Sequence, residues 1–334
     1  MRLSEGASGS RILAVGAYSP ARVVTNDEIC ARIDSDDAWI RTRSGIATRR
    51  VAGPAESVVD MAHRAGHDAM CAAGLTPDDI DLVVVATSSL PYQTPGAAAE
   101  VAHRIGIPAP GAMDITAGCA GFCYALSVAS DAVRTGSSAR ALVIGSERPT
   151  DMVDPADRSM AFLFGDGAGA AVVGRSAEPG IAPVVWGSDG SKVGAIAQRP
   201  TFAELRADVL AGGEVALPMV RMDGAAVFRW ATAEVARVAA RALQVAGVAP
   251  HELGAFVPHQ ANLRIIEAVA RTLKLPKSVP VARDIVHRGN TSTASIPLAL
   301  HAMLERGEVK SGEPALFVGF GAGLTYAGQV ALIP

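Results

Sequence analysis

The chain has 334 residues, of which 49% are hydrophobic, and its 33 acidic and 30 basic residues leave a net charge of −3. A chain of this size can bury a large core, in one large domain or two fused ones. The near balance of charge excludes nucleic acid as the main partner, since no basic stripe or charged tail is present.

The cysteines and the N-terminal segment predict a cytoplasmic protein. Cys30, Cys71, Cys119 and Cys123 include no CxxC pair, and a secreted disulfide framework would be arranged differently. Residues 1–9 contain no apolar signal core. No apolar stretch of about 18 residues is free of charged and turn residues, so we expect no membrane span.

The predicted elements of the first part of the chain alternate between helix and strand. Residues 58–70 predict a helix, and the continuous apolar runs 82–86 and 141–144 predict strands that are covered on both faces. Between those runs, residues 124–135 predict a second helix that ends at a C-cap glycine, Gly136. This alternation is typical of the α/β class.

Cys119 directly precedes this second helix and has small residues on both sides. Unpaired N–H groups and the positive end of the helix dipole favour a thiolate there. We therefore expect a lowered pKa, in the range of about 3.5–7.5 rather than about 8.5. The alternative is a buried cysteine that packs as a small hydrophobe.

Three further features are weaker signals. The run 165–169 is glycine-rich but lacks GxGxxG spacing and leads into a strand-like run, so we expect close backbone packing rather than a dinucleotide site. Residues 187–218 predict a loop-rich excursion that covers a binding site. His63 and His67 have a metal-capable spacing on a helix, but no third ligand accompanies them, so we expect no metal site.

The second part of the chain repeats the first. Residues 74–87 match 247–260, and residues 58–70 match 231–243, at one common offset. This duplication predicts two fused halves, 1–175 and 176–334. Equivalent strand ends of such halves tend to meet, so Cys119 of the first half is expected to approach two residues of the second, namely His259 and Asn290. Each of those two also has a structural interpretation, a strand-end histidine and a helix N-cap.

Taken together, the motifs resemble the thiolase superfamily and, within it, the β-ketoacyl-acyl-carrier-protein synthase III family. The resemblance covers nearly the whole chain and rests on Asp36–Ile46, Ala117–Phe122, Phe164–Gly169, Pro258–Asn262, Gly289–Ser292 and Gly319–Tyr326. It implies an α/β thiolase-like fold, in which two duplicated halves pack as an α-β-α-β-α core. It also implies a homodimer that needs no cofactor beyond its thioester substrates.

The resemblance assigns catalysis to Cys119, His259 and Asn290, with an oxyanion hole made by the backbone N–H groups of Cys119 and Ala322. It implies that an acyl-CoA primer is loaded on Cys119 and condensed with malonyl-acyl carrier protein, with loss of CO2, to begin fatty-acid synthesis. Neutral His259 and the Asn290 amide would stabilise the enolate oxygen.

The same resemblance separates this chain from its relatives. The chain has no cysteine after Cys123, whereas thiolases need a late one, and elongating synthases have a second histidine where Asn290 stands. Two alternatives stay open. One is a starter-unit synthase or acyltransferase of a specialised polyketide pathway, and the other is a non-catalytic partner, although such partners usually lose the cysteine.

The resemblance also implies roles for residues around the site. Contacts to CoA and its pantetheine arm fall on Trp39, Arg43, Arg158, Asn262, Gly224 and Phe228. Thr94 and Phe320 match acyl-pocket positions, and Arg264 matches a residue that docks the carrier protein. Ordinary packing and solvated arginines are the structural alternatives. Because Thr94 is smaller than the aromatic residue of acetyl-selective relatives, we expect a branched or longer primer; Thr293 stands where alanine is commoner, with no predicted effect.

Overall fold

The structure is a computed structural model that describes residues 6–213 and 215–334. Residues 1–5, part of the segment in which we expect no signal sequence, and residue 214 lie outside the described residues. No helix in the described ranges is both long and apolar enough to cross a membrane.

The first main sheet has the strand order β1-β7-β6-β4-β5. β4 runs parallel to β5 and β6, while β7 runs antiparallel to both β6 and β1. β4 is buried at every position, as the continuous apolar run predicted. The strands are β1 (Gly9–Tyr18), β4 (Leu82–Ala86), β5 (Gly111–Ile115), β6 (Arg140–Glu147) and β7 (Gly167–Ser176).

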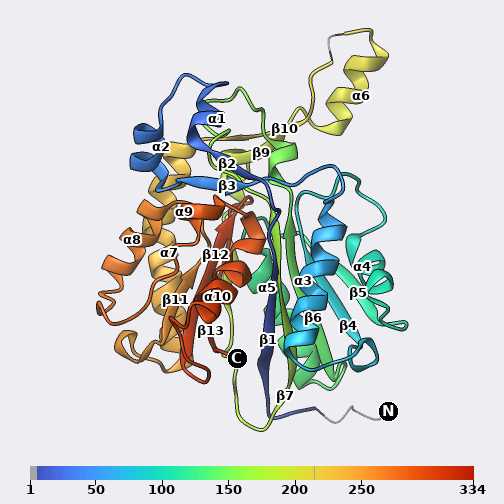
Figure 1. Ribbon diagram of the computed structural model, residues 1–334, viewed down its shortest axis with the longest axis vertical. Helices are drawn as coiled ribbons and strands as arrows, with labels where there is room; N and C mark the ends of the chain where they lie inside the picture. Colours follow the sequence, from blue (N-terminus) through green and yellow to red (C-terminus); the bar gives the residue numbers. More distant parts are fainter. Residues whose placement is uncertain (1–5, 214) are drawn as a thin grey trace.

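The second main sheet has the order β11-β12-β13-β8. β11 and β12 are parallel, and β13 runs antiparallel to both β12 and β8. Its strands are β8 (Val185–Ser188), β11 (Ala255–Pro258), β12 (Pro314–Gly321) and β13 (Thr325–Leu332). The two sheets stand side by side in Figure 1, with helices between them and on both outer faces.

Three hydrophobic clusters define the layers. The central cluster joins helices α5 (Gly121–Arg134) and α10 (Ser295–Glu305) to the inner faces of both sheets. A second cluster packs α3 (Val58–Ala72) and α4 (Ala97–Ile105) on the outer face of the first sheet. A third packs α7 (Gly224–Ala246) and α8 (Leu263–Thr272) on the second sheet. The described residues therefore form the predicted α-β-α-β-α core; the boundary near residue 175 stays a prediction.

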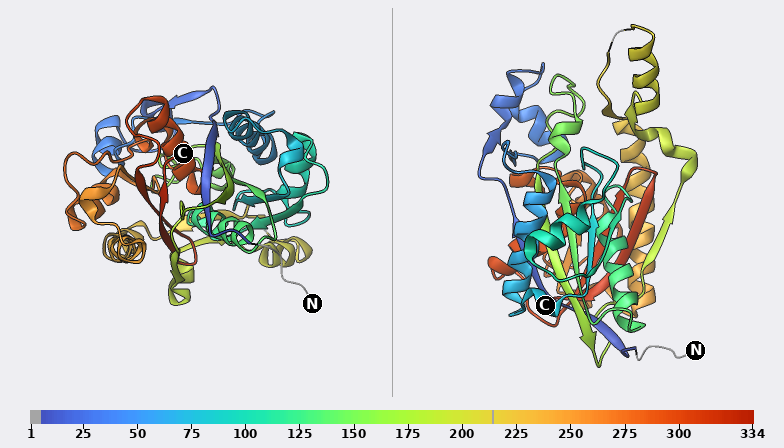
Figure 2. Two further views of the ribbon diagram at one scale, coloured as in Figure 1. Left: turned by 90° about the horizontal axis from the view of Figure 1, so that it is seen from below. Right: turned by 90° about the vertical axis from the view of Figure 1, so that its right-hand side faces the viewer.

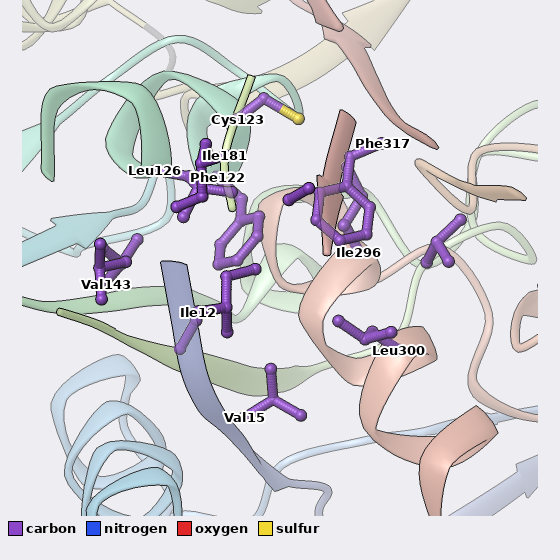
Figure 3. Packing of buried hydrophobic residues seen from close by; sticks show 14 of the residues in the cluster. Ile12, Val15, Phe122, Cys123, Leu126, Val143, Ile181, Ile296, Leu300 and Phe317 are labelled. Atoms are coloured by element: carbon purple, nitrogen blue, oxygen red, sulfur yellow. The ribbon is translucent and has the colours of Figure 1, made fainter. Parts of the chain in front are cut away.

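The central cluster fastens the two sheets to each other. Figure 3 shows Phe122 of α5 close to Ile12 of β1 on one side, and Phe317 of β12 close to Ile296 of α10 on the other. Each of these side chains is at most 2% exposed, and full burial of such a side chain stabilises by about 1.5–3 kcal/mol. The site described below lies at the end of this shared interior, so both sheets hold it in place.

Small elements cover one end of the core, at the top of Figure 1. They are β2 (Val23–Thr25), α1 (Asn26–Cys30), α2 (Asp37–Ser44), β3 (Thr48–Arg50), β9 (Ile196–Arg199), α6 (Phe202–Leu210), β10 (Met219–Met222) and α9 (Ile285–Arg288). Short 3-10 helices lie at Pro77–Asp79, Pro149–Met152, Gly190–Ala195, Pro250–Glu252 and Ser292–Ala294, and the third of them is kinked at Lys192.

The prediction of a loop-rich excursion over residues 187–218 is wrong in part, because strands and a helix occupy much of this range. β9 and β10 form an antiparallel pair, and α6 projects from the body of the protein (Figures 1 and 2). Local bonds explain both elements, since α6 buries no residue and begins at a capping box of Thr201 and Glu204. Such elements leave no apolar periodicity in the sequence.

The glycine-rich run has the predicted structural role. It leads into β7, a strand rather than a helix. A Cβ on Gly165 would lie 2.1 Å from the Arg288 carbonyl oxygen, and a Cβ on Gly169 would lie 2.8 Å from the Leu298 nitrogen. Only glycine allows backbones to approach this closely, so the interpretation as a packing motif is confirmed.

Candidate active site

One cavity of about 620 Å³ brings together residues from distant motifs. Cys119, His259 and Asn290 all line it, although they come from three separate segments of the chain. Trp39 of α2 and Val220 of β10 belong to the same lining, so the small elements at this end form part of its wall. The cavity is therefore bounded by both main sheets and by the strands β9 and β10.

Cys119 sits in the turn that leads into α5. The helix begins at Gly121 after an Ala120 N-cap, and Gly118 takes a left-handed φ of 51°. The expected place at a helix N-terminus is observed, but the expected low pKa is wrong. Burial raises the pKa of Cys119 to about 12; the negative charge of Glu147 adds to this rise, whereas a hydrogen bond with Ser292 lowers the pKa.

The backbone around Cys119 is in direct contact with the end of β12. A Cβ on Gly321 would lie 2.4 Å from the Cys119 nitrogen, and a Cβ on Gly118 would lie 2.7 Å from the Ala322 nitrogen. Ala322 also lines the cavity. The two N–H groups assigned to the oxyanion hole thus belong to segments that touch, and glycine is needed at both contacts.

His259 follows β11 and is held rigidly. It is 2% exposed, its backbone N–H donates to the Val318 carbonyl at 2.8 Å, and its ring lies edge-on to Phe320 with centroids 5.3 Å apart. Nδ1 lies 2.7 Å from the Ser295 hydroxyl oxygen. Burial lowers the pKa of His259 to about 3, with a backbone contact to Ser292 acting in the opposite direction, so the imidazole is neutral near pH 7.

Asn290 is fixed by its backbone and by one side-chain oxygen. Its N–H donates to the Leu163 carbonyl at 2.8 Å, and its carbonyl accepts from Gly165 at 3.1 Å. Oδ1 accepts from the Ser292 N–H at 2.8 Å. The side-chain amide nitrogen is therefore the group that can donate a hydrogen bond into the cavity. The helix predicted to start here, α10, begins only at Ser295, after a 3-10 turn.

An aromatic ring with two guanidinium groups close to it stands at the mouth of the cavity. The Cζ atoms of Arg158 and Arg43 lie 4.9 and 5.8 Å from the centroid of the Trp39 ring, within the range of cation–π attraction. Asn262, the N-cap of α8, donates to the Arg43 carbonyl at 3.0 Å. Arg43 lines the cavity, whereas Arg158 reaches its mouth through Trp39.

The α7 side of the mouth carries three more of the predicted residues. Gly224 and Phe228 line the cavity, as does Arg264, whose guanidinium lies over the Phe228 ring at 5.1 Å. An alanine Cβ at Gly224 would meet only the Met222 side chain, at 3.9 Å. The glycine is therefore not required by crowding, and at this position it keeps the wall open.

The structure does not bring Thr94 into the cavity of its own chain. Thr94 is exposed, in the loop before α4, and is absent from the lining of that cavity. Thr293, in contrast, is buried, and its hydroxyl has no hydrogen-bond partner among the described residues. That hydroxyl would be 3.0 Å from a Cβ on Gly121.

Sequence reasoning missed three polar residues of the site. Glu147 ends β6, Ser292 lies beside Cys119 and Ser295 lies beside His259. A signal was present for Glu147, because ligand sites gather at the carboxyl ends of buried parallel strands. The run Asn290–Ser295 is polar throughout except for Ala294, and that pattern favours a site over a plain helix start.

The stacked sheets, with cysteine, histidine and asparagine side chains meeting between them, define a protein of the thiolase fold. The model described as 3-oxoacyl-[acyl-carrier-protein] synthase III matches residues 113–190, and the model of its C-terminal part matches residues 243–333. The chain belongs to this family, also named β-ketoacyl-acyl-carrier-protein synthase III, as the motifs predicted.

Relatives and solved structures agree over the full length. β-Ketoacyl-acyl-carrier-protein synthase III 1 of Streptomyces coelicolor is 51% identical over 99% of this chain and 98% of its own. The priming β-ketosynthase of the R1128 polyketide pathway superposes with a TM-score of 0.96 at 49% identity, covering 100% of this chain and 98% of that one. The synthase III of Pseudomonas aeruginosa gives 0.89 at 36% identity, covering 98% of both chains.

Proposed function

We propose that the protein is a β-ketoacyl-acyl-carrier-protein synthase III. An acyl-CoA primer acylates Cys119, and the acyl group is condensed with malonyl-acyl carrier protein to give β-ketoacyl-acyl carrier protein, CoA and CO2, the step that begins fatty-acid synthesis. The observation that carries this proposal is the meeting of a thiol, a neutral imidazole and a free amide group in one cavity. The names of the full-length relatives support it.

In the first half-reaction Cys119 acts as the nucleophile. A thiolate attacks a thioester readily and later leaves readily, as a two-step transfer requires. The N–H groups of Cys119 and Ala322 would receive the oxygen of the tetrahedral intermediate, and the close contact of their two segments supports this role. Each such donor is worth about 2.7–4 kcal/mol in comparable acyl transfers.

In the second half-reaction His259 and Asn290 stabilise the enolate that forms when malonyl loses CO2. The Ser295 hydroxyl oxygen accepts a hydrogen bond from the Gln260 N–H at 3.2 Å, so its own proton is available to His259 Nδ1. The ring proton is then on Nε2, where it can donate to the enolate oxygen beside the Asn290 amide. With a pKa of about 3, His259 holds no second proton that would quench the carbanion.

The mouth of the cavity suits CoA and a carrier protein. Trp39 offers a flat face for the adenine, and Arg43 and Arg158 beside it offer forks for phosphate groups. The pantetheine arm would then pass Asn262, Gly224 and Phe228. Arg264, at the same mouth, would meet the acidic surface of the carrier protein.

A second copy of the chain completes the acyl pocket. β5 is an edge strand that pairs only with β4 among the described strands, and its Met113 side chain is 43% exposed. Exposed edges of this kind pair with another chain. Asp114 of β5 accepts from the N–H groups of Ala97 and Ala98 at 2.7 and 2.8 Å, so the loop that carries Thr94 is attached to this edge. Pairing through β5 would present Thr94 to the other copy.

The specialised polyketide pathway is the second candidate, because a priming ketosynthase of such a pathway superposes so closely. Assays with fatty-acid and polyketide carrier proteins as malonyl donors separate the two. For the primer, competition among acyl-CoA esters tests the role of Thr94, and a strong preference for acetyl-CoA over four-carbon and longer primers would contradict it. The four unpaired cysteines support a cytoplasmic location.

Two neighbouring cysteines provide a matched test of the nucleophile. Burial raises the thiol pKa of both Cys119 and Cys123 to about 12. Cys123 belongs to the central cluster (Figure 3), and of the two only Cys119 lines the cavity. After incubation with mixed acyl-CoA, intact-mass measurement should show an acyl adduct on Cys123→Ala and none on Cys119→Ala. An adduct that persists in Cys119→Ala, with full condensing activity, would end this proposal.

A further inference from the structure

The Cys119 thiol must lose a proton to attack a thioester, because the thiolate is the nucleophile. Burial raises its pKa to about 12, so near pH 7 the sulfur is protonated. A histidine is the usual acceptor for such a proton, but burial lowers the pKa of His259 to about 3, which makes its ring a weak base. The thiol proton needs another acceptor.

Glu147 is the one carboxylate among the described residues that line the cavity. It is 1% exposed, and its two oxygens differ. Oε2 accepts from the Ser88 N–H at 3.1 Å, from the Thr87 hydroxyl at 3.4 Å and from the Ser89 hydroxyl. Among the described residues, Oε1 accepts only from Ser292, at 2.8 Å. One oxygen thus anchors the carboxylate, and the other faces Ser292.

Ser292 bridges the carboxylate and the nucleophile. Its Oγ lies 3.3 Å from Cys119 Sγ and 2.8 Å from Glu147 Oε1. A hydroxyl has one proton to donate and lone pairs that accept, so when the proton points to Glu147 a lone pair is open to the thiol. The three side chains then form a continuous chain of hydrogen bonds from the sulfur to the carboxylate.

The backbone of Ser292 adds a second, independent observation. Its φ is 50°, in the left-handed region that is unfavourable for a residue with a side chain and open to glycine. Strain of this kind persists mainly at functional sites. A serine at this position keeps a hydroxyl where glycine would fit the backbone better.

The other charged or titratable groups that the structure describes near these three side chains form no ion pair with Glu147. The guanidinium of Arg148, the residue after Glu147, donates to the carbonyls of Gly53 and Glu56 at 3.1 and 3.2 Å. His259, across the cavity, is neutral near pH 7. Burial raises the pKa of Glu147 above that of an ordinary glutamate, against the lowering by its hydrogen bonds, so its carboxylate is a stronger proton acceptor than an exposed one.

We propose that Glu147 accepts the proton of the Cys119 thiol through Ser292 during acyl loading. The S–H bond breaks as the sulfur bonds the thioester carbonyl carbon; the proton moves to Ser292 Oγ, which passes its own proton to Glu147 Oε1. When the bond from carbon to the CoA sulfur breaks, the proton ends on the departing sulfur, so the carboxylate is restored and CoA leaves as a thiol. This proton transfer rests on the proposed acylation of Cys119.

Alkylation of the thiol by iodoacetamide tests the proton transfer without any acyl-CoA, so its result does not depend on the proposed function. In the unmodified protein the internal acceptor makes the rate nearly constant between about pH 6 and 9. In Ser292→Gly and Glu147→Gln only hydroxide can remove the proton, so the rate should rise about tenfold per pH unit. Acyl loading near pH 7 should fall about a hundredfold or more, and recover as the pH rises.

Two features keep this test interpretable. Ser292→Gly removes the hydroxyl and relieves an unfavourable φ, but it also takes the donor from Glu147 Oε1, so a thermal melt checks that this variant is folded. Asp166→Asn is the control: Asp166 is likewise buried, with a raised pKa, but bonds Ala52 and Thr150 rather than Ser292, and its variant should keep the constant rate. A folded Ser292→Gly or Glu147→Gln that also keeps the constant rate would overturn the proposal.

Discussion

Gly321→Ala tests whether the contact between two backbones positions the nucleophile. The new Cβ would lie 2.4 Å from the Cys119 nitrogen and 3.1 Å from the Cys119 Cβ, whereas Cβ contacts under 3.0 Å essentially never occur and ordinary contact begins at 3.4 Å. The end of β12 and the turn before α5 would therefore have to separate by about 0.6–1 Å. Neither side can yield by rotating a side chain, because the closest atom belongs to the backbone.

That displacement separates the N–H groups of Cys119 and Ala322, so the proposed oxyanion hole would lose its geometry. A misplacement of about 1 Å costs about 10²-fold in rate, and loss of one donor costs about 10²–10³-fold. We therefore expect acyl loading to slow by about 10²–10³-fold. Overpacking of this kind also destabilises by about 1–3 kcal/mol, so the variant should fold with a lower Tm.

The assay follows acyl-enzyme formation over time by intact-mass spectrometry, beside a thermal melt. Gly194→Ala is the control, because no heavy atom lies within 4 Å of a Cβ placed there, and it should load at the normal rate. A folded Gly321→Ala protein that loads as fast as the unmodified one would refute the idea that this contact holds the oxyanion donors in place.

Four shorter predictions follow from the same geometry. Asn290→Ala should lower malonyl decarboxylation about 10²–10³-fold while acyl loading persists; equal loss of both steps would contradict the assigned role. Because His259 is neutral above its pKa of about 3, decarboxylation should not vary through histidine titration from about pH 5 to 8, and a fall centred near pH 6.5 would disagree. Met113→Lys places a charge on the β5 edge and should yield monomers in light scattering. Thr293→Val replaces a buried hydroxyl without a partner among the described residues and should stabilise by about 1 kcal/mol in denaturant unfolding.

Much of the fold could be predicted from local patterns in the sequence. The apolar run 82–86 became the fully buried strand β4, and residues 58–70 lie within α3, because burial on both faces and helical periodicity leave direct marks on the sequence. The family was recognised from short motifs whose order no single element dictates. Their approach in space follows from the way the two sheets pack about the central helices.

What could not be predicted depends on contacts between distant residues. The pKa of Cys119 was expected to be low from its helix terminus alone, but burial and the charge of Glu147 raise it. Ser292, which touches that sulfur, is 173 residues away in the chain. The elements β9, β10 and α6 were missed for a different reason. Local capping and strand pairing form them, and neither leaves an apolar pattern in the sequence.

The protonated state of Cys119 has a consequence for chemical durability. Peroxide attacks thiolates and converts them to sulfenic acid and then to irreversible higher oxides. A nucleophile whose pKa is about 12 presents almost no thiolate to peroxide in the unloaded protein. The sulfur becomes nucleophilic only as its proton passes to the internal acceptor, so the rate of its oxidation depends on whether peroxide can take the place beside the sulfur that a thioester carbonyl takes.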